Sequence, residues 1–124
     1  MIAREGVTLT LDASVAVAEA LFHSLSDRAR LQIVQRLAAG ELRVTDLVAE
    51  LGLAQSTVSK HLACLRKCGL VSGRPEGRQV FYSLARPELL ELLAVAETLL
   101  AATGSAVALC PTYGRPDVTA EAGR

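Results

Sequence analysis

Three cysteines are the residues of this sequence best suited to bind a metal ion. Cys64 and Cys68 are four positions apart, a spacing that puts both side chains on one face of a helix. Their sulfur atoms are then close enough to hold one soft cation. Cys110 follows much later, on a segment long enough to fold back or to reach a second copy of the chain. Together the three residues offer three thiolates.

The same cysteines are open to other interpretations. Free cysteine is often a small buried hydrophobic residue, and Cys68 beside Gly69 could pack at a helix end. A cytosolic thiol pair can also be a redox switch, although an i, i+4 pair aligns poorly for a disulfide, which favours a bond to Cys110. An enzyme would use Cys64 as nucleophile and His61 as base, but no orienting Asp or Asn accompanies them. We expect no enzyme.

The cysteine pair belongs to a helix predicted from about residue 55 to residue 67. Val58, Leu62 and Leu65 form its narrow inward stripe. The outward face is small, polar and basic, which suits the major groove of DNA, where hydroxyl groups and a lysine reach base edges and phosphates. The predicted DNA contacts of this helix are Gln55, Ser56, Thr57, Ser59, Lys60 and His61.

Three further helices are predicted before this one. The segment from Asp12 to Phe22 is rich in Ala, Val and Leu and indicates a mostly buried helix. A second helix follows Ser26-Asp27 and ends near Gly40. A short third helix begins at Thr45 and ends before Gly52, where the chain can turn sharply. Two helices joined by such a turn are typical of a helix-turn-helix.

A β-hairpin and a last helix complete the expected fold. The hairpin strands are predicted at residues 70–74 and 78–84, joined by Pro75-Glu76-Gly77. Arg74 and Arg78 lie on either side of this turn, where they could contact the DNA backbone. Pro87 suits the first turn of the last helix. The predicted fold class is mainly α with a small β-hairpin, a dimeric winged helix-turn-helix.

Length and composition favour one small domain that pairs with a second copy. The chain has 124 residues, 51% of them hydrophobic, and a chain of this length buries a limited share of its surface. We therefore expect the first and last helices to face a partner subunit. The domain is predicted at residues 12–102, between an N-terminal arm of residues 1–11 and a flexible tail of residues 103–124 that holds Cys110.

The charge is balanced overall but unevenly distributed. Thirteen basic and thirteen acidic residues give a net charge of zero, whereas the stretch from Arg43 to Arg86 has seven cations and three anions. A local basic face for double-stranded DNA is therefore expected. With two Phe, two Tyr and no Trp, the aromatic platforms that bind single strands are scarce. No secretion signal or membrane span is evident, so we expect a cytoplasmic protein with no membrane partner.

Three sequence motifs, in this order, resemble the ArsR/SmtB family of metal-responsive repressors. They are residues 25–30 (LSDRAR), 55–62 (QSTVSKHL) and 77–82 (GRQVFY), and the resemblance covers about residues 12 to 102. It implies a homodimeric winged-helix repressor, paired through its first and last helices, that leaves its operator when an effector binds. Ala54 departs from the pattern, because relatives usually have a capping Ser there, so the recognition helix is expected to begin less firmly.

The cysteines resemble one subgroup of that family. Leu42-Arg43-Val44 lacks the cysteines of the family's third-helix site, and residues 86–100 lack the Asp, His and Glu set of its fifth-helix site. The run from His61 to Gly69, with a cysteine in the tail, is similar to the cadmium- and lead-sensing CmtR subgroup. The resemblance implies Cd(II) or Pb(II) as effector on Cys64, Cys68 and Cys110, with As(III) or Sb(III) as the alternative for a three-sulfur site.

Overall fold

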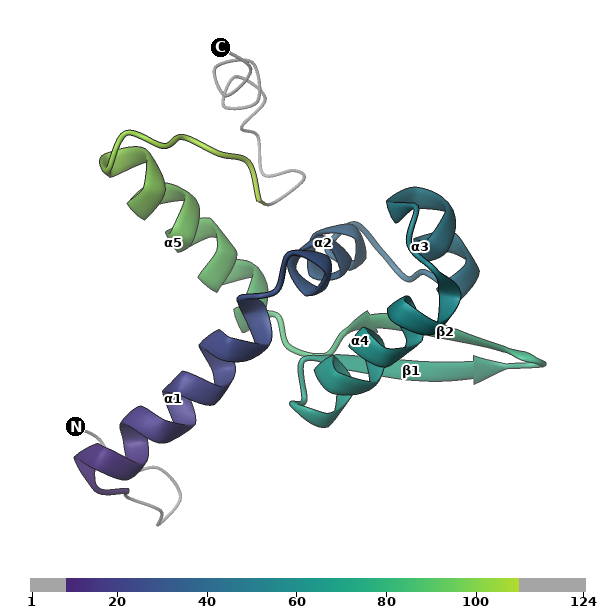
Figure 1. The fold of residues 1–124 in the computed structure, drawn as a ribbon, viewed down its shortest axis with the longest axis horizontal. Helices are drawn as coiled ribbons and strands as arrows, with labels where there is room; N and C mark the ends of the chain where they lie inside the picture. The colour runs from purple at the N-terminus through teal and green to yellow at the C-terminus, as the bar shows by residue number, and fades with distance from the viewer. Residues whose placement is uncertain (1–8, 110–124) are drawn as a thin grey trace.

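The structure, a computed structural model, describes residues 9–109 of the chain. Its elements are α1 (Leu11–Leu25), α2 (Arg28–Leu37), α3 (Val44–Leu51), α4 (Gln55–Lys67), β1 (Val71–Glu76), β2 (Gln79–Leu84) and α5 (Glu88–Ala102). In Figure 1, α2, α3, α4 and the hairpin gather on one side, whereas α1 and α5 extend away as two arms. The predicted winged helix-turn-helix, mainly α with a small hairpin, is confirmed.

The core forms around the inward stripe of α4. Val58, Leu62 and Leu65 are at most 1% exposed, as predicted, and α4 packs against α2 and α3. Ile33 of α2 and Leu47 of α3 are completely buried in the same cluster. Burial of each such side chain contributes about 1.5–3 kcal/mol relative to exposure. These contacts determine how α4 lies in the domain.

The helix starts follow the capping residues. The Asp27 side chain accepts the backbone N–H of Arg30 at 3.1 Å and caps α2, so the N-cap is Asp27, one residue after the predicted Ser26. The third helix begins at Val44, one residue before the predicted start, because Asp46 accepts the backbone N–H of Arg43 at 2.9 Å. At α4 the predicted bounds hold, and Ala54 at the N-cap makes no side-chain hydrogen bond.

The first helix is longer and far more exposed than predicted. It extends from Leu11 to Leu25, and only Ser24 and Leu25 are buried. The expectation of a mostly buried helix was wrong for the single chain, because α1 projects from the core instead of crossing it (Figure 1). Large apolar side chains of both arms are exposed, namely Leu11, Val15, Val17, Phe22, Val95, Leu99 and Leu100.

The wing, as we call the β1–β2 hairpin, turns one step later than expected. Glu76 pairs with Gln79, so the turn is Gly77-Arg78 rather than Pro75-Glu76-Gly77. Gly77 has φ 66°, a left-handed conformation that glycine adopts without strain and that tight hairpin turns require. Pro75 lies inside β1, which a two-stranded sheet tolerates because each strand is an edge strand.

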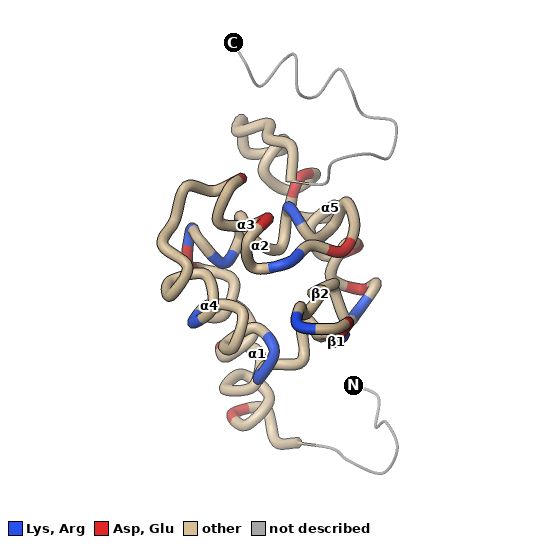
Figure 2. The backbone as a smooth tube through the Cα atoms, turned by 90° about the vertical axis from the view of Figure 1, so that its right-hand side faces the viewer, with Lys and Arg blue, Asp and Glu red and all other residues tan. Residues whose placement is uncertain are grey.

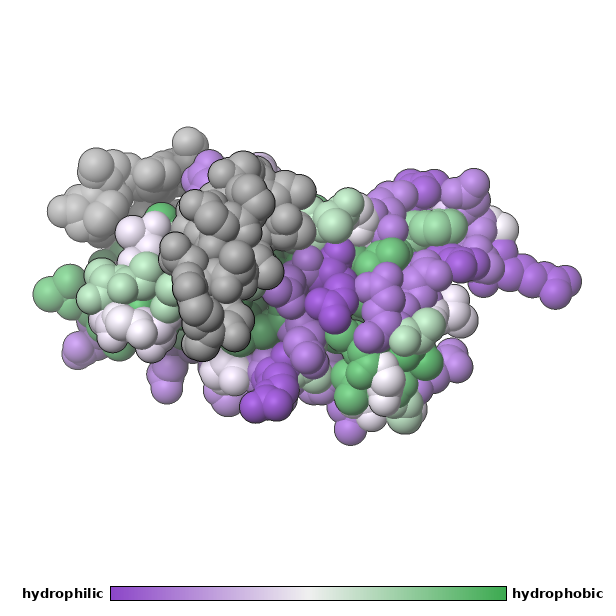
Figure 3. All heavy atoms as spheres, turned by 90° about the horizontal axis from the view of Figure 1, so that it is seen from above, coloured by the Kyte–Doolittle hydropathy of each residue, from purple (hydrophilic) through white to green (hydrophobic). Residues whose placement is uncertain are grey.

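Leu42 anchors the wing to the linker between α2 and α3. Its backbone N–H donates to the Tyr82 carbonyl at 3.0 Å, and the Tyr82 N–H donates to the Leu42 carbonyl at 2.8 Å. The wing therefore has a defined orientation relative to the helices. Figure 3 shows the projecting wing as hydrophilic.

The chain after α5 makes defined contacts, although a flexible tail was expected from residue 103. The Ser105 N–H donates to the Leu100 carbonyl at 2.8 Å, and the Gln35 side chain donates to the Ala108 carbonyl at 3.2 Å. The Leu109 N–H donates to the buried carboxylate of Glu97. The rest of the expected tail, with Cys110, lies outside the described residues. Within residues 9–109, no helix is long and apolar enough to cross a membrane.

Candidate DNA-binding face and thiol site

The turn between α3 and α4 exposes one side of α4. Gly52 ends α3 with φ 69°, in the left-handed conformation that commonly closes a helix. α4 then lies against α3, and its inward stripe occupies the core. Its remaining faces are available for other partners.

The first turns of α4 carry most of the predicted DNA contacts. Gln55, Ser56, Ser59 and Lys60 are exposed, and Thr57 is half-buried next to the core. In the described part of the chain, Lys60 forms no ion pair, so its charge is available to a phosphate. Figure 2 shows basic segments on α4 and on the wing.

His61, also predicted as a DNA contact, faces the start of α2. Its Nδ1 lies 3.4 Å from Arg30 Nη1, and its Nε2 lies 3.7 Å from Asp27 Oδ2. The side chain is 17% exposed. The backbone N–H of Arg30 lowers the pKa of Asp27, and nearby positive charge adds to this effect. His61 therefore connects α4 to the start of α2, and its contact with DNA stays a prediction.

Arg74 of the wing is already paired with two carboxylates. Its Nη2 lies 2.8 Å from Glu41 Oε1, and its Nη1 lies 2.7 Å from Glu76 Oε1. The guanidinium also lies over the Phe81 ring, 5.2 Å from the centroid. The hydrogen bond to Glu41 is the largest cause of a raised pKa of Arg74. Much of the charge predicted to meet DNA is thus neutralised within the protein.

Arg78 is the wing cation left available. It is exposed at the turn and forms no ion pair within residues 9–109. A shallow hollow between the wing and α3–α4 brings Arg78 together with Gln55, and Thr45 and Gln79 also line it. Sequence reasoning missed Thr45 and Gln79, because only the folded wing brings them beside the recognition helix.

The thiol pair occupies the other end of α4. Cys64 is half-buried, Cys68 is exposed, and both are free thiols. The Cys68 N–H donates to the Cys64 carbonyl at 3.1 Å, so the two residues lie one helical turn apart. Both cysteines lie outside the buried stripe of α4. A role as small buried hydrophobic residues therefore does not explain the pair. The donor set fits a thiophilic ion.

A single described chain does not bring a third ligand to these thiols. Within residues 9–109 no group of three Cys, His, Asp or Glu side chains could hold a metal. The non-sulfur neighbour of Cys68 is Ser24, whose Oγ lies 3.0 Å from its Sγ. Sequence reasoning missed Ser24, which is 44 residues away from Cys68.

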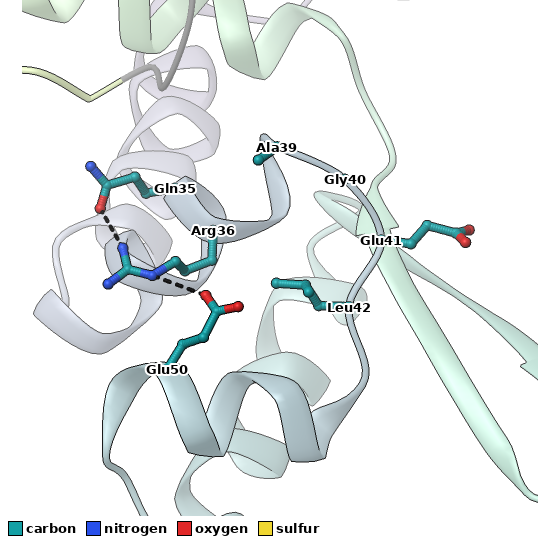
Figure 4. A pocket seen from close by; sticks show the side chains of 7 residues that line it. All are labelled: Gln35, Arg36, Ala39, Gly40, Glu41, Leu42 and Glu50. Carbon is teal, nitrogen blue, oxygen red and sulfur yellow. Dashed lines mark hydrogen bonds and ion pairs between the residues drawn. The ribbon is translucent and has the colours of Figure 1, made fainter.

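A separate hollow between α2 and α3 shows no comparable chemistry. Arg36 and Glu50 on its walls pair with each other at 3.2 Å. Glu41 also lines it, but Figure 4 shows this side chain pointing away from the other labelled residues, and it pairs with Arg74. Because its charges are paired, the hollow is a weaker candidate for a ligand site than the thiols.

Comparison with known proteins identifies the family. Residues 27–72 match the model of bacterial regulatory proteins of the arsR family. The chain is 42% identical over 85 residues to the HTH-type transcriptional regulator CmtR of Mycobacterium bovis, covering 68% of this chain and 72% of that protein. It is 36% identical over 89 residues to a probable mercury resistance operon repressor of Streptomyces lividans, covering 72% of this chain and 71% of that protein.

A solved structure supports the same assignment. The homodimeric winged helix-turn-helix DNA-binding domain of a possible ArsR-family regulator from Mycobacterium bovis matches with a TM-score of 0.68 and 28% identity. The match covers 79% of this chain and 91% of that one. The names of these relatives are those of transcriptional regulators and repressors. The chain belongs to the ArsR family of bacterial regulatory proteins.

Proposed function

We propose that this protein is a transcriptional repressor that binds operator DNA as a homodimer and is released when Cd(II) or Pb(II) binds its cysteines. The observation that carries the proposal is the arrangement of α4. Its first turns expose Ser56 and Lys60, and its last turn carries the free thiols of Cys64 and Cys68. A ligand on the thiols therefore acts on the helix that reads DNA.

DNA binding uses the exposed face of α4 and the turn of the wing. α4 enters the major groove, where Gln55, Ser56 and Ser59 reach base edges and Lys60 reaches a phosphate. Arg78 of the wing contacts the adjacent backbone and adds salt-dependent affinity. Because the partner is DNA, we place the protein in the cytoplasm.

Pairing through α1 and α5 supplies a second α4 helix for the second half-site of the operator. Both arms expose large apolar residues, including Val17 and Leu99, whose burial against a second copy is favourable. The relative that was solved as a homodimer has the same fold. A two-fold dimer places two α4 helices about one turn of DNA apart, so a small change in subunit orientation disrupts binding.

Cys64 and Cys68 are the first two metal ligands, and Cys110 is the third. A bound soft cation supplies strong sulfur bonds that hold separate segments of the chain together. The chain returns toward α2 and α5 at Ala108 and Leu109, directly before Cys110. Whether Cys110 acts within or between protomers is decided by mixing Cys110→Ser chains with Cys64→Ser/Cys68→Ser chains. Only a site shared between protomers restores metal binding in the mixture.

The function is tested by titration of a protein–DNA complex. A duplex is first enriched from a random pool with the metal-free protein, giving the selected duplex. Cd(II), Pb(II), Zn(II), Ni(II), Hg(II) and As(III) are then added under reducing conditions. Release by Cd(II) and Pb(II) supports the proposal. Release by As(III) alone supports the arsenic alternative, and release by oxidant but by no metal supports a redox regulator.

A further inference from the structure

We propose that Ser24 is a positioning residue that links the metal state of Cys68 to helix α1. This inference rests on the proposed metal-dependent function and names a residue that carries the signal. Ser24 is 3% exposed at the end of α1, and its Oγ lies 3.0 Å from Cys68 Sγ. It joins the end of the recognition helix to the arm whose apolar face is proposed to pair with a second copy.

The Ser24 hydroxyl group has two neighbours, the Ala20 carbonyl and the Cys68 sulfur. The Ser24 hydroxyl donates to the Ala20 carbonyl at 3.0 Å. A hydroxyl group has one hydrogen to donate and lone pairs to accept with. With this hydrogen directed to Ala20, a lone pair of the Ser24 oxygen faces Cys68 Sγ, and either atom of the Ser24–Cys68 contact can be its donor.

Metal coordination would leave the Ser24 hydroxyl as the only possible donor of this contact. When a metal ion binds Cys68 Sγ, it takes the place of the thiol hydrogen, which leaves to solvent as a proton. The sulfur then has no hydrogen to donate, and two acceptors face each other at 3.0 Å. Ser24 resolves this by rotating its hydroxyl from Ala20 toward the metal-bound sulfur. Such a bond to a ligand atom orients it and strengthens metal binding.

Ser24 is also bonded to the rest of α4 through its backbone. The Ser24 carbonyl accepts Arg30 Nε at 2.6 Å, and Arg30 Nη1 lies 3.4 Å from His61 Nδ1. His61 of α4 and Cys68, the residue that caps its end, are thus both connected to one residue of α1. When metal binding at Cys68 changes the hydrogen bonding of Ser24, α1 shifts relative to α4, and with it the dimer face relative to the DNA-binding face.

The test compares Ser24→Ala with Ser26→Ala. Ser26 is the matched control, because its hydroxyl donates to the His23 carbonyl at 2.9 Å at the same helix end but is not bonded to a cysteine. Three quantities are measured for each protein: Cd(II) affinity by chelator competition, affinity for the selected duplex without metal, and the factor by which Cd(II) lowers that affinity. Thermal unfolding without metal checks that each variant is folded.

For Ser24→Ala we expect Cd(II) affinity about tenfold weaker than wild type and a smaller Cd(II) factor on DNA binding. Metal-free DNA affinity should stay within about twofold, because the hydroxyl is remote from the DNA face. Ser26→Ala should match wild type in all three. If wild type and Ser24→Ala agree in Cd(II) affinity and in the Cd(II) factor, the role of Ser24 is overturned while the proposed function stands. If wild type binds Cd(II) without losing DNA affinity, the proposed function fails, and the Cd(II) affinities alone then decide whether Ser24 supports the site.

Discussion

Arg74 Nη2 of the wing lies 2.8 Å from Glu41 Oε1 in the linker after α2. With Glu76 bonded on its other side, Arg74 is committed to contacts inside the protein. Arg78, two residues beyond Glu76, forms no ion pair in the described part of the chain. The two wing arginines, equivalent in the sequence pattern, therefore differ in how their charges are paired within the protein.

Replacement of Arg78 should weaken DNA binding more than replacement of Arg74. Arg78→Ala should lower affinity for the selected duplex by about three- to tenfold and reduce the salt slope by about one, because one phosphate contact is lost. Arg74→Ala is the control and should change the slope less. Binding measured between low and moderate salt checks both values. An equal loss of slope in the two variants would mean that Arg74 leaves Glu41 to bind DNA.

Asp46 should make stability depend on pH. Two hydrogen bonds from the Arg43 side chain and one from its backbone lower the pKa of Asp46 from 3.8 to about 2. A carboxylate with a lowered pKa in the folded state contributes stability above its unfolded pKa and loses it as the pH falls. Wild type should therefore lose its advantage over Asp46→Asn between about pH 4 and pH 2. Urea unfolding at several pH values measures the difference in free energy of unfolding between the two proteins. A difference that stays constant over this pH range would contradict the prediction.

The exposed arm residues should control assembly. Leu99 on α5 is 63% exposed in the single chain, and a Glu there would place a charge in the proposed dimer face, where burial is costly. Leu99→Glu should sediment as a monomer and bind the selected duplex about tenfold more weakly or worse, since both half-sites are no longer engaged together. Ala49→Glu, on the exposed side of α3, should remain a dimer. A dimeric Leu99→Glu would place the interface elsewhere.

A capping residue at the start of the recognition helix should raise the stability of the protein. Ala54 is the N-cap of α4 and makes no side-chain hydrogen bond, whereas a serine there accepts a backbone N–H of the first turn. Ala54→Ser should raise the free energy of unfolding by about 1 kcal/mol. Ala63→Ser, at an exposed position inside α4, should lower it slightly. Chemical denaturation distinguishes them, and no gain at Ala54 would show that the first turn is already satisfied.

Local patterns predicted the elements well and the long-range contacts poorly. The stripe of Val58, Leu62 and Leu65 and the turn at Gly52 suffice to place α4, because periodicity and a left-handed glycine act within a few residues. The exposure of α1 was missed because apolar composition alone does not say whether a helix packs on its own domain or on a partner.

In the candidate site, too, local features were predictable and long-range contacts were not. The thiol spacing was readable from the sequence, since Cys64 and Cys68 are one helical turn apart. The partners of the charged and polar groups were not readable. Glu41 is 33 residues from Arg74, and Ser24 is 44 residues from Cys68, so no local pattern records either contact. The contacts of His61 with Arg30 and Asp27, more than 30 residues earlier in the chain, were unreadable for the same reason.

Metal-dependent release is decided by comparing wild type with Cys64→Ser/Cys68→Ser. Fluorescence anisotropy of the selected duplex, with and without Cd(II) under reducing conditions, measures affinity in both states. Wild type should lose at least about tenfold in affinity with Cd(II), a coupling of about 1.4 kcal/mol. The double variant should bind DNA as wild type does without metal and should not respond to Cd(II). A double variant that Cd(II) still releases, or a wild type that Cd(II) leaves bound, would contradict the assignment of these two thiols as the effector site.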